Sequence, residues 1–318
     1  MINTNLPLVS VVFTSYNHQE YLKQALDSIV NQTYPNLEII VVDDNSTDGS
    51  QQILKSYKDN PKITLHLLEK NTGSYVKASN YGARLAKGEY LLFAQCDDHA
   101  DPEQIEKLVS AFSNEGNIGV VYSKSNLIDE NDVFICDDFT GREKSFRKKC
   151  KNDAFISGKE MKDFLSFSCV IPNLSAALIK KDLYFQCGGL PERYMMAADW
   201  AMWLELTENS NFFYLTECLN NFRQHSNTIR SKTKIRTQIN EIYSLFYSHI
   251  ENHKLSSDQK HKIKIGAGGV WFSYFIEDFK SWFLNFPSVF SDSLKYEKRN
   301  LRYLFLGALK LTKEVVYK

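Results

Sequence analysis

The sequence has no surplus of charge, because 38 Lys and Arg residues balance 38 Asp and Glu residues over 318 positions. Nucleic-acid-binding domains carry a basic surplus, so we expect no nucleic acid as a partner. Proline (7) and glycine (14) are scarce, which excludes collagen-like and low-complexity chains. No apolar run approaches the roughly 20 residues of a membrane-spanning helix, and the first residues lack the basic stretch of a secretory signal. The sequence therefore predicts a folded, cytoplasmic protein.

Motifs of several large protein classes are missing too. The six cysteines form no CxxC pair and show no zinc-finger spacing with histidine, so we expect free thiols. No glycine-rich loop follows the first apolar run and the pattern GxxxxGK is absent, which excludes a dinucleotide-binding loop and a P-loop. The GAGG stretch at 266–269 follows a helical segment and is weak evidence for a phosphate loop.

Apolar runs and helical patterns alternate through the first hundred residues. The runs that predict strands are Leu8–Phe13, Leu37–Val42, Ile63–Leu68 and Tyr90–Ala94. The helical patterns lie at residues 21–30, 49–57 and 75–86 and after Asp101. Four strand–helix units with fully apolar strands predict an α/β fold whose parallel sheet is covered on both faces.

The rest of the chain is less regular. A strand is expected at Gly119–Tyr122, a charged loop at 137–151 and a helix near residues 199–208, which suits a sheet finished by mixed strands. From about Thr233 the composition shifts to helix formers with many aromatic residues. We therefore predict one domain over residues 1–232 and a helical extension over residues 233–318.

Polar clusters stand at the ends of three predicted strands, at residues 14–17, 43–48 and 95–98. The carboxyl ends of parallel strands meet at one edge of a sheet, where ligands bind. The adjacent carboxylates of Asp97 and Asp98 repel each other unless a cation lies nearby, so they predict a divalent metal that also holds an anionic ligand. An acidic loop without a metal is the alternative.

Three segments follow one known pattern in order: VSVVFTSYNHQEYLKQALDSIVNQTYPNLEIIVVDDNSTD, then AKGEYLLFAQCDD, then CGGLPERY with ADWAMWLEL. They resemble the family 2 glycosyltransferases of GT-A fold, which transfer a sugar from a nucleotide donor. The resemblance covers roughly residues 7–230. It implies a GT-A αβα sandwich with a mainly parallel, nucleotide-binding sheet, divided into a nucleotide-binding half at 1–100 and an acceptor half at 101–232.

The resemblance also implies a nucleotide site at the first two strand ends. Asp44 would accept the N3 proton of a uracil, with Thr14 and the ring of Tyr16 beside it; the alternative is that Asp44 only caps a loop. Asn17 is interpreted as structural, because Asn17 and Glu20 have the spacing of a capping box.

Two further residues are candidates for donor binding. The segment NTGSYVKASNYG lacks the family's usual arginine beside the alanine, and Lys77 would supply positive charge to the phosphates instead; the alternative is a solvated helix lysine. Gly189 would let the backbone approach the donor sugar closely, whereas the alternative is an ordinary turn.

A divalent metal, Mn²⁺ or Mg²⁺, is implied at the third strand end. The family commonly has an aspartate where this chain has Gln95, so ligation would rest on Asp98, with Asp97 nearer the ribose. His225, in an Arg-x-His arrangement, would complete the metal site or contact the diphosphate, whereas a solvated loop histidine is the alternative.

Asp199 matches the aspartate that serves the family as general base, which takes the proton of the acceptor hydroxyl. The apolar residues before it suit a base with a raised pKa, and an additional or alternative role is to cap the following helix. The family's preceding glutamate is Ala198 in this chain. Trp200 and Trp203 would stack on an acceptor sugar, or else belong to the core.

The C-terminal segment 295–318 carries seven Lys and Arg residues against two Glu residues, with apolar residues between them. This pattern is typical of a basic amphipathic helix that lies on an anionic membrane. In a cell, that membrane would be the inner face of the plasma membrane. Packing on the chain's own domain or on a second subunit of a homo-oligomer is an equal alternative.

Together these features predict an inverting, metal-assisted glycosyltransferase that moves a sugar from a nucleotide-sugar donor, first of all a UDP-sugar, to a glycan or lipid-linked glycan. The resemblance points to bacterial surface-polysaccharide assembly. One alternative is a catalytically silent nucleotide-sugar-binding or scaffold protein, suggested by Gln95 and Ala198. The other is a sugar-nucleotidyltransferase, which needs a glycine-rich phosphate loop that the first strand lacks.

Overall fold

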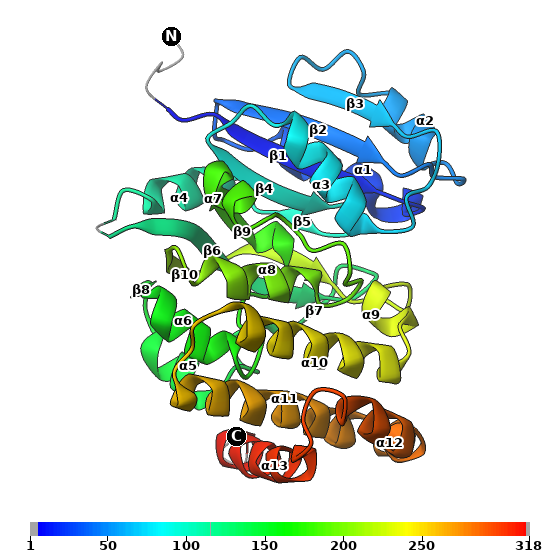
Figure 1. Ribbon diagram of the computed structural model, residues 1–318. Coiled ribbons are helices and arrows are strands. Elements are labelled where there is room, and N and C mark those ends of the chain that lie inside the picture. Colours follow the sequence, from blue (N-terminus) through cyan, green and yellow to red (C-terminus); the bar gives the residue numbers. More distant parts are fainter. Residues whose placement is uncertain (1–5, 115, 316–318) are drawn as a thin grey trace.

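The computed structural model describes residues 6–114 and 116–315. An α/β domain with a ten-stranded sheet fills the upper part of Figure 1, and long helices from the C-terminal quarter lie below it. The strand order is β3-β2-β1-β4-β9-β6-β10-β5, with β7 beside β6 and β8 beside β10. The expected fold class, a mainly parallel α/β sheet followed by a helical region, is confirmed.

Parallel strands make up the first part of the sheet. β1 (Val9–Ser15) lies between β2 (Leu37–Asp43) and β4 (Tyr90–Gln95), and β3 (Ile63–Leu67) pairs with the far side of β2. All seven residues of β1 are buried, as expected for a central strand with helices on both faces. The helices of this part are α1 (Gln19–Val30), α2 (Ser50–Lys55) and α3 (Tyr75–Leu85).

Mixed strands complete the sheet, as predicted. β9 (Ala177–Lys180) runs antiparallel between β4 and β6 (Ile118–Ile128). β10 (Asn211–Arg223) is parallel to β6, and the short β5 (His99–Ala100) is antiparallel to β10. The other elements are α4 (Gln104–Ala111), β7 (Phe134–Asp137), α5 (Lys144–Lys149), β8 (Ala154–Ile156), α6 (Gly158–Leu165), η1 (Leu174–Ala176), α7 (Lys181–Gln186) and α8 (Ala198–Leu206).

The helical extension packs directly on this domain. Ile239 of α10 and Trp271 of α11 belong to the same buried cluster as Trp203 of α8 and Tyr122 of β6. Within residues 6–114 and 116–315, no helix combines the length and the apolar character that crossing a bilayer requires. The helices after β10 in the described chain are α9 (Ile229–Lys232), α10 (Ile235–Asn252), α11 (Ser257–Glu277), α12 (Phe279–Ser293) and α13 (Asn300–Val315).

The GAGG stretch lies inside α11, where it lets α13 approach closely. A Cβ atom on Gly268 would lie 2.2 Å from the carbonyl oxygen of Tyr303, and one on Gly307 would lie 2.1 Å from the backbone nitrogen of Gly269. Neither position has room for a side chain, because real Cβ contacts are longer than 3 Å. The glycines therefore serve helix packing and form no phosphate loop.

Candidate active site

Hydrogen bonds join the loops that follow β1 and β2 at the carboxyl edge of the sheet. The N–H of Asn17 donates to Ser46 Oγ at 3.0 Å, and the N–H of Thr47 donates to Asn17 Oδ1 at 2.8 Å. Asn17 has a left-handed φ of 52°, and α1 begins at Gln19 without a side-chain cap. The predicted capping box is therefore wrong, because the Asn17 side chain bridges two loops instead of capping the helix.

The predicted nucleotide-binding residues meet at this edge. The N–H of Asp44 donates to the carbonyl of Ser15, the residue between Thr14 and Tyr16. The Asp44 carboxylate is buried, and it accepts hydrogen bonds from the N–H of Thr72 at 2.7 Å and from its hydroxyl at 2.9 Å. Thr14 is buried, whereas Tyr16 is 44% exposed. The edge thus combines a fixed carboxylate with an accessible ring.

Asp98 is buried at this edge, and three protein groups donate hydrogen bonds to its carboxylate. Its carboxylate accepts hydrogen bonds from Asn173 Nδ2 at 2.6 Å, Ser175 Oγ at 2.8 Å and the N–H of Arg223 at 3.1 Å. Burial, followed by the charge of Asp97, raises the pKa of Asp98. The Asp98 carboxylate thus ties the end of β4 to η1 and β10, and its predicted metal-binding role stays a prediction.

Asp97, the neighbouring residue, belongs to the cluster that could hold a metal. Its Oδ2 lies 3.1 Å from His225 Nε2, and the His18 ring packs edge-on against the His225 ring with the centroids 5.4 Å apart. The ligand atoms of His18, Asp97 and His225 all lie within 4.8 Å of one another. His18 Nε2 is buried and has no hydrogen-bond partner among the residues that the structure describes. One carboxylate and two imidazoles, one with an unpaired nitrogen, fit a divalent metal.

Arg223 is a buried residue that holds Asp97 of this cluster in place. Its side chain is 1% exposed, and its Nε donates to the carbonyl of Asp97 at 2.9 Å. Its Nη2 pairs with Asp132 at 2.7 Å, and the guanidinium lies 4.5 Å from the centroid of the Tyr21 ring. Sequence reasoning noted Arg223 only as part of the Arg-x-His pattern. It missed His18 altogether, although His18 follows the polar residues at the end of β1.

Asp199 lies in the first turn of α8, and its Oδ1 accepts the N–H of Trp200 at 2.7 Å. Burial raises the pKa of Asp199 to about 6, against the lowering effect of that hydrogen bond. Its charge adds to the effect of burial in raising the pKa of Tyr75, which begins α3. Asp199 is therefore within electrostatic reach of Tyr75, which follows Thr72 by three residues in the chain. The helix cap itself is Ala197, so the capping role is not observed.

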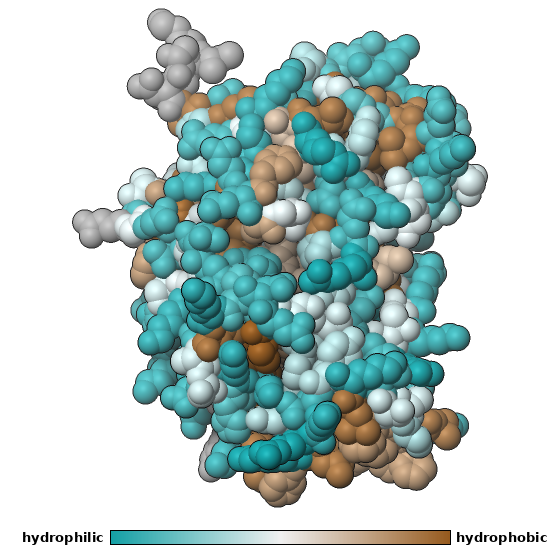
Figure 2. Space-filling view, viewed as in Figure 1, coloured by the Kyte–Doolittle hydropathy of each residue, from teal (hydrophilic) through white to brown (hydrophobic). Residues whose placement is uncertain are grey.

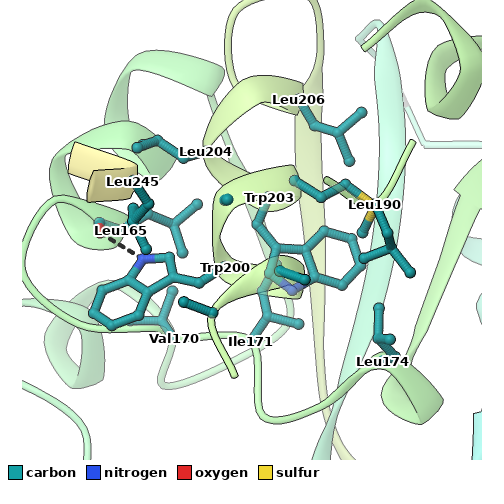
Figure 3. Close-up of a cluster of buried hydrophobic side chains, with 14 of the residues drawn as sticks. Leu165, Val170, Ile171, Leu174, Leu190, Trp200, Trp203, Leu204, Leu206 and Leu245 are labelled. Atoms are coloured by element: carbon teal, nitrogen blue, oxygen red, sulfur yellow. Dashed lines mark hydrogen bonds between the residues drawn. The ribbon is translucent and has the colours of Figure 1, made fainter. Parts of the chain in front are cut away.

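The two tryptophans of α8 belong to the core. Trp203 is 0% and Trp200 is 8% exposed, and the Trp200 indole N–H donates to the carbonyl of Leu165 at 2.8 Å. Figure 3 shows both indoles among aliphatic side chains that include Val170 and Ile171. The acceptor-binding prediction is therefore corrected for both residues, because a buried ring offers no face to a sugar.

Gly189 packs against α3, and Lys77 is part of that helix. Gly189 has a φ of 72° and its N–H donates to the carbonyl of Tyr184 at 2.9 Å. A Cβ atom there would lie 3.0 Å from Oδ1 of Asn80 on α3, so the turn needs a glycine. Lys77 is exposed on the same helix. Their donor-binding roles stay predictions, because the structure assigns Gly189 a turn and leaves Lys77 in solvent.

Glu241, on α10, is a residue that sequence reasoning missed. Its carboxylate accepts the N–H groups of Met195 at 3.0 Å, Met196 at 2.8 Å and Ala197 at 3.0 Å. These residues lead directly into the first turn of α8. The extension therefore holds the segment that positions Asp199, and only the tertiary structure reveals this.

Comparison with known sequences identifies relatives. The family model for glycosyl transferase family 2 matches residues 10–159. An uncharacterized glycosyltransferase of Rickettsia typhi is 32% identical over 224 residues, which are 70% of this chain and 66% of that protein. The hyaluronan synthase of Pasteurella multocida is 27% identical over 233 residues, which are 73% of this chain. The chain spans only 22% of that synthase and 21% of a chondroitin synthase from the same species.

Solved structures share the fold. Residues 1–349 of S. aureus TarS in complex with UDP-GlcNAc match with a TM-score of 0.69 at 20% identity, over 96% of this chain and 89% of that one. A mannosyltransferase from Pyrobaculum calidifontis in complex with GDP-Man and Mn²⁺ matches with a TM-score of 0.58 at 17% identity, over 97% and 88% of the two chains. At such coverage the likeness includes the C-terminal helices as well as the sheet.

Proposed function

Since the chain belongs to glycosyltransferase family 2 and is therefore a glycosyltransferase, we propose that it transfers a sugar from a UDP-sugar to a glycan or lipid-linked glycan, with inversion, during assembly of a bacterial surface polysaccharide. The main support for this proposal is the cluster of His18, Asp97 and His225, which lies at the same sheet edge as Asp44. The UDP-GlcNAc bound to TarS supports a UDP-sugar as the donor.

The donor binds at the ends of β1, β2 and β4. Asp44 uses the lone pairs that Thr72 leaves free to accept the uracil N3 proton, since a carboxylate offers about four acceptor positions. The exposed ring of Tyr16 packs on the base. Lys77 lends positive charge to the diphosphate as a point charge.

His18, Asp97 and His225 would hold a divalent metal beside that diphosphate. Two imidazole nitrogens favour Mn²⁺ over Mg²⁺, which prefers oxygen ligands. When bound, the metal neutralises the negative charge that develops on the departing diphosphate. Arg223 keeps Asp97 in place through the Asp97 carbonyl, so the carboxylate itself stays free to ligate.

Asp199 acts as the general base. At neutral pH it is ionised, because burial raises its pKa only to about 6, and its Oδ1 is fixed by the N–H of Trp200. The carboxylate takes the proton of the acceptor hydroxyl while that oxygen attacks the donor sugar in line with the departing diphosphate. Such in-line attack inverts the configuration at the reacting carbon.

Thermal unfolding of the full chain with UDP, GDP, CMP and dTDP, each with and without Mn²⁺, tests the donor site. UDP with Mn²⁺ is expected to stabilise the wild type most, by about 2.7 kcal/mol at 100 times its dissociation constant. Asp97→Asn is expected to abolish the Mn²⁺-dependent part, whereas Asp59→Asn, at an exposed turn, leaves it unchanged. Equal shifts for Asp97→Asn and wild type, or none with any nucleotide, would refute the metal–diphosphate site.

We also propose that α13 docks on an anionic membrane. Leu301, Phe305 and Leu309, at successive helix turns, are 60%, 64% and 43% exposed, and Figure 2 shows apolar surface at the lower end of the molecule over α12 and α13. The exposed Lys298 and Arg302 supply charges that anionic headgroups attract.

Co-sedimentation with phosphatidylglycerol and phosphatidylcholine vesicles measures this docking. We expect binding to the anionic vesicles only, and a loss of several-fold in Phe305→Ser but not in Leu85→Ser, a matched change at an exposed leucine of α3. A concentration-dependent dimer without vesicle binding would instead assign this face to a second subunit.

A further inference from the structure

A second cluster of ligating side chains shares no residue with the cluster of His18, Asp97 and His225. It joins α8 to α10, which lies beside α8 in Figure 1. Glu205 belongs to α8, and His249 and His253 stand one turn apart at the end of α10. Glu205 Oε1 lies 3.2 Å from His249 Nδ1, and Glu205 Oε2 lies 2.8 Å from His253 Nε2. The ligand atoms of the three residues all lie within 4.8 Å of one another.

His249, the buried histidine of this cluster, also lies close to a second carboxylate, that of Glu208. His249 is 1% exposed, and its Nε2 lies 3.2 Å from Glu208 Oε1. Lys162 Nζ lies 2.5 Å from the same oxygen. Histidines that ligate a metal through one ring nitrogen almost always donate the other N–H to a carboxylate or carbonyl, which fixes the ring and its tautomer. His249 lies between two carboxylates: its Nδ1 is hydrogen-bonded to Glu205, and its Nε2 is within ion-pair distance of Glu208 but forms no hydrogen bond within the described part of the chain.

We propose that Glu205, His249 and His253 bind Zn²⁺. Two imidazoles and one carboxylate are a zinc donor set, whereas Mg²⁺ and Ca²⁺ prefer oxygen ligands. The His253 side chain is 24% exposed, so water has access to the fourth position that three protein ligands leave open.

The ion links the glycosyltransferase domain to the extension. Glu205 lies six residues after Asp199 on the same helix, whereas His249 lies in α10, which also carries Glu241, and His253 is the residue that caps the end of α10. Zinc at this point therefore stiffens the contact between α8 and α10. This inference does not depend on the proposed donor or acceptor.

Zinc titration of the full chain, after treatment with a chelator, tests the site. The His225→Ala background removes a ligand of the other cluster, so that one binding event is read. We expect one Zn²⁺ per chain in competition with a chromophoric chelator, together with a rise in Tm that Mg²⁺ does not produce. Adding His253→Ala is expected to weaken binding at least about tenfold, because it removes one of the three ligands.

His261→Ala, at a half-buried histidine of α11 outside both clusters, serves as the matched control and is expected to bind zinc like its parent. Far-UV circular dichroism shows whether each variant folds, and His253→Gln replaces His253→Ala if that variant does not. Absence of zinc binding in the His225→Ala background overturns the proposal. So does binding that His253→Ala leaves unchanged, or a Tm that depends on these side chains but not on zinc, which would leave only a hydrogen-bonded network.

Discussion

Replacing Asp199 with asparagine is expected to lower kcat about 100- to 10,000-fold, the usual range for loss of a general base. Asparagine keeps the oxygen that accepts the N–H of Trp200, so the first turn of α8 stays in place while the proton acceptor is lost. Initial rates of UDP release from a UDP-sugar, with an acceptor present, measure the effect. A residual activity above about a tenth of wild type would contradict the assignment.

The wild-type pH profile tests the same residue independently. Burial raises the pKa of Asp199 to about 6, so kcat/KM is expected to fall as the pH drops through that value and the carboxylate becomes protonated. Above it the base is ionised and the rate levels off. Asp199→Asn loses this acid limb. Asp182→Asn, at an exposed carboxylate in the first turn of α7, is the matched control and keeps both rate and profile.

The strand–helix units of the first hundred residues are predictable because each depends on local periodicity. β9 is different: it inserts antiparallel between β4 and β6, and pairings such as Leu91 with Ile179 join residues far apart in the chain. Sequence reasoning placed mixed strands in this region without their order. The contacts that set the order are tertiary and leave no local pattern.

The candidate site shows the same division. The polar strand ends identified the sheet edge, but adjacent residues such as Asp97 and Asp98 look alike in sequence. Their surroundings differ because Asn173 and Ser175, more than seventy residues away in the chain, donate hydrogen bonds to the Asp98 carboxylate. The Asp97 carboxylate instead lies within hydrogen-bond distance of His225. The spacing of the two tryptophans left open whether Trp203 binds an acceptor or belongs to the core. The tertiary structure decides this, because it buries the ring.

The second large effect is expected at Glu241, a positioning residue that acts through the segment before Asp199. Its Oε2 accepts the N–H groups of Met196 and Ala197, and its Oε1 accepts that of Met195. Hydrogen bonds to a charged acceptor are about twice as strong as neutral ones. Glutamine can satisfy only one of the two sides, because its NH₂ group then faces a backbone N–H. We expect Glu241→Gln to lower kcat on the order of 10- to 100-fold by displacing the base.

The balance between kcat and KM separates positioning from a general loss of stability. Glu241 takes no part in the hydrogen bonds of Asp44 or in the cluster of His18, Asp97 and His225. The KM of the donor is therefore expected to stay near its wild-type value. The acid limb near pH 6 should remain, because Asp199 is still buried. Glu251→Gln, an exposed carboxylate on the same helix, is the matched control. If Glu241→Gln lowers Tm while the folded fraction keeps wild-type kcat, the residue stabilises the extension and does not position the base.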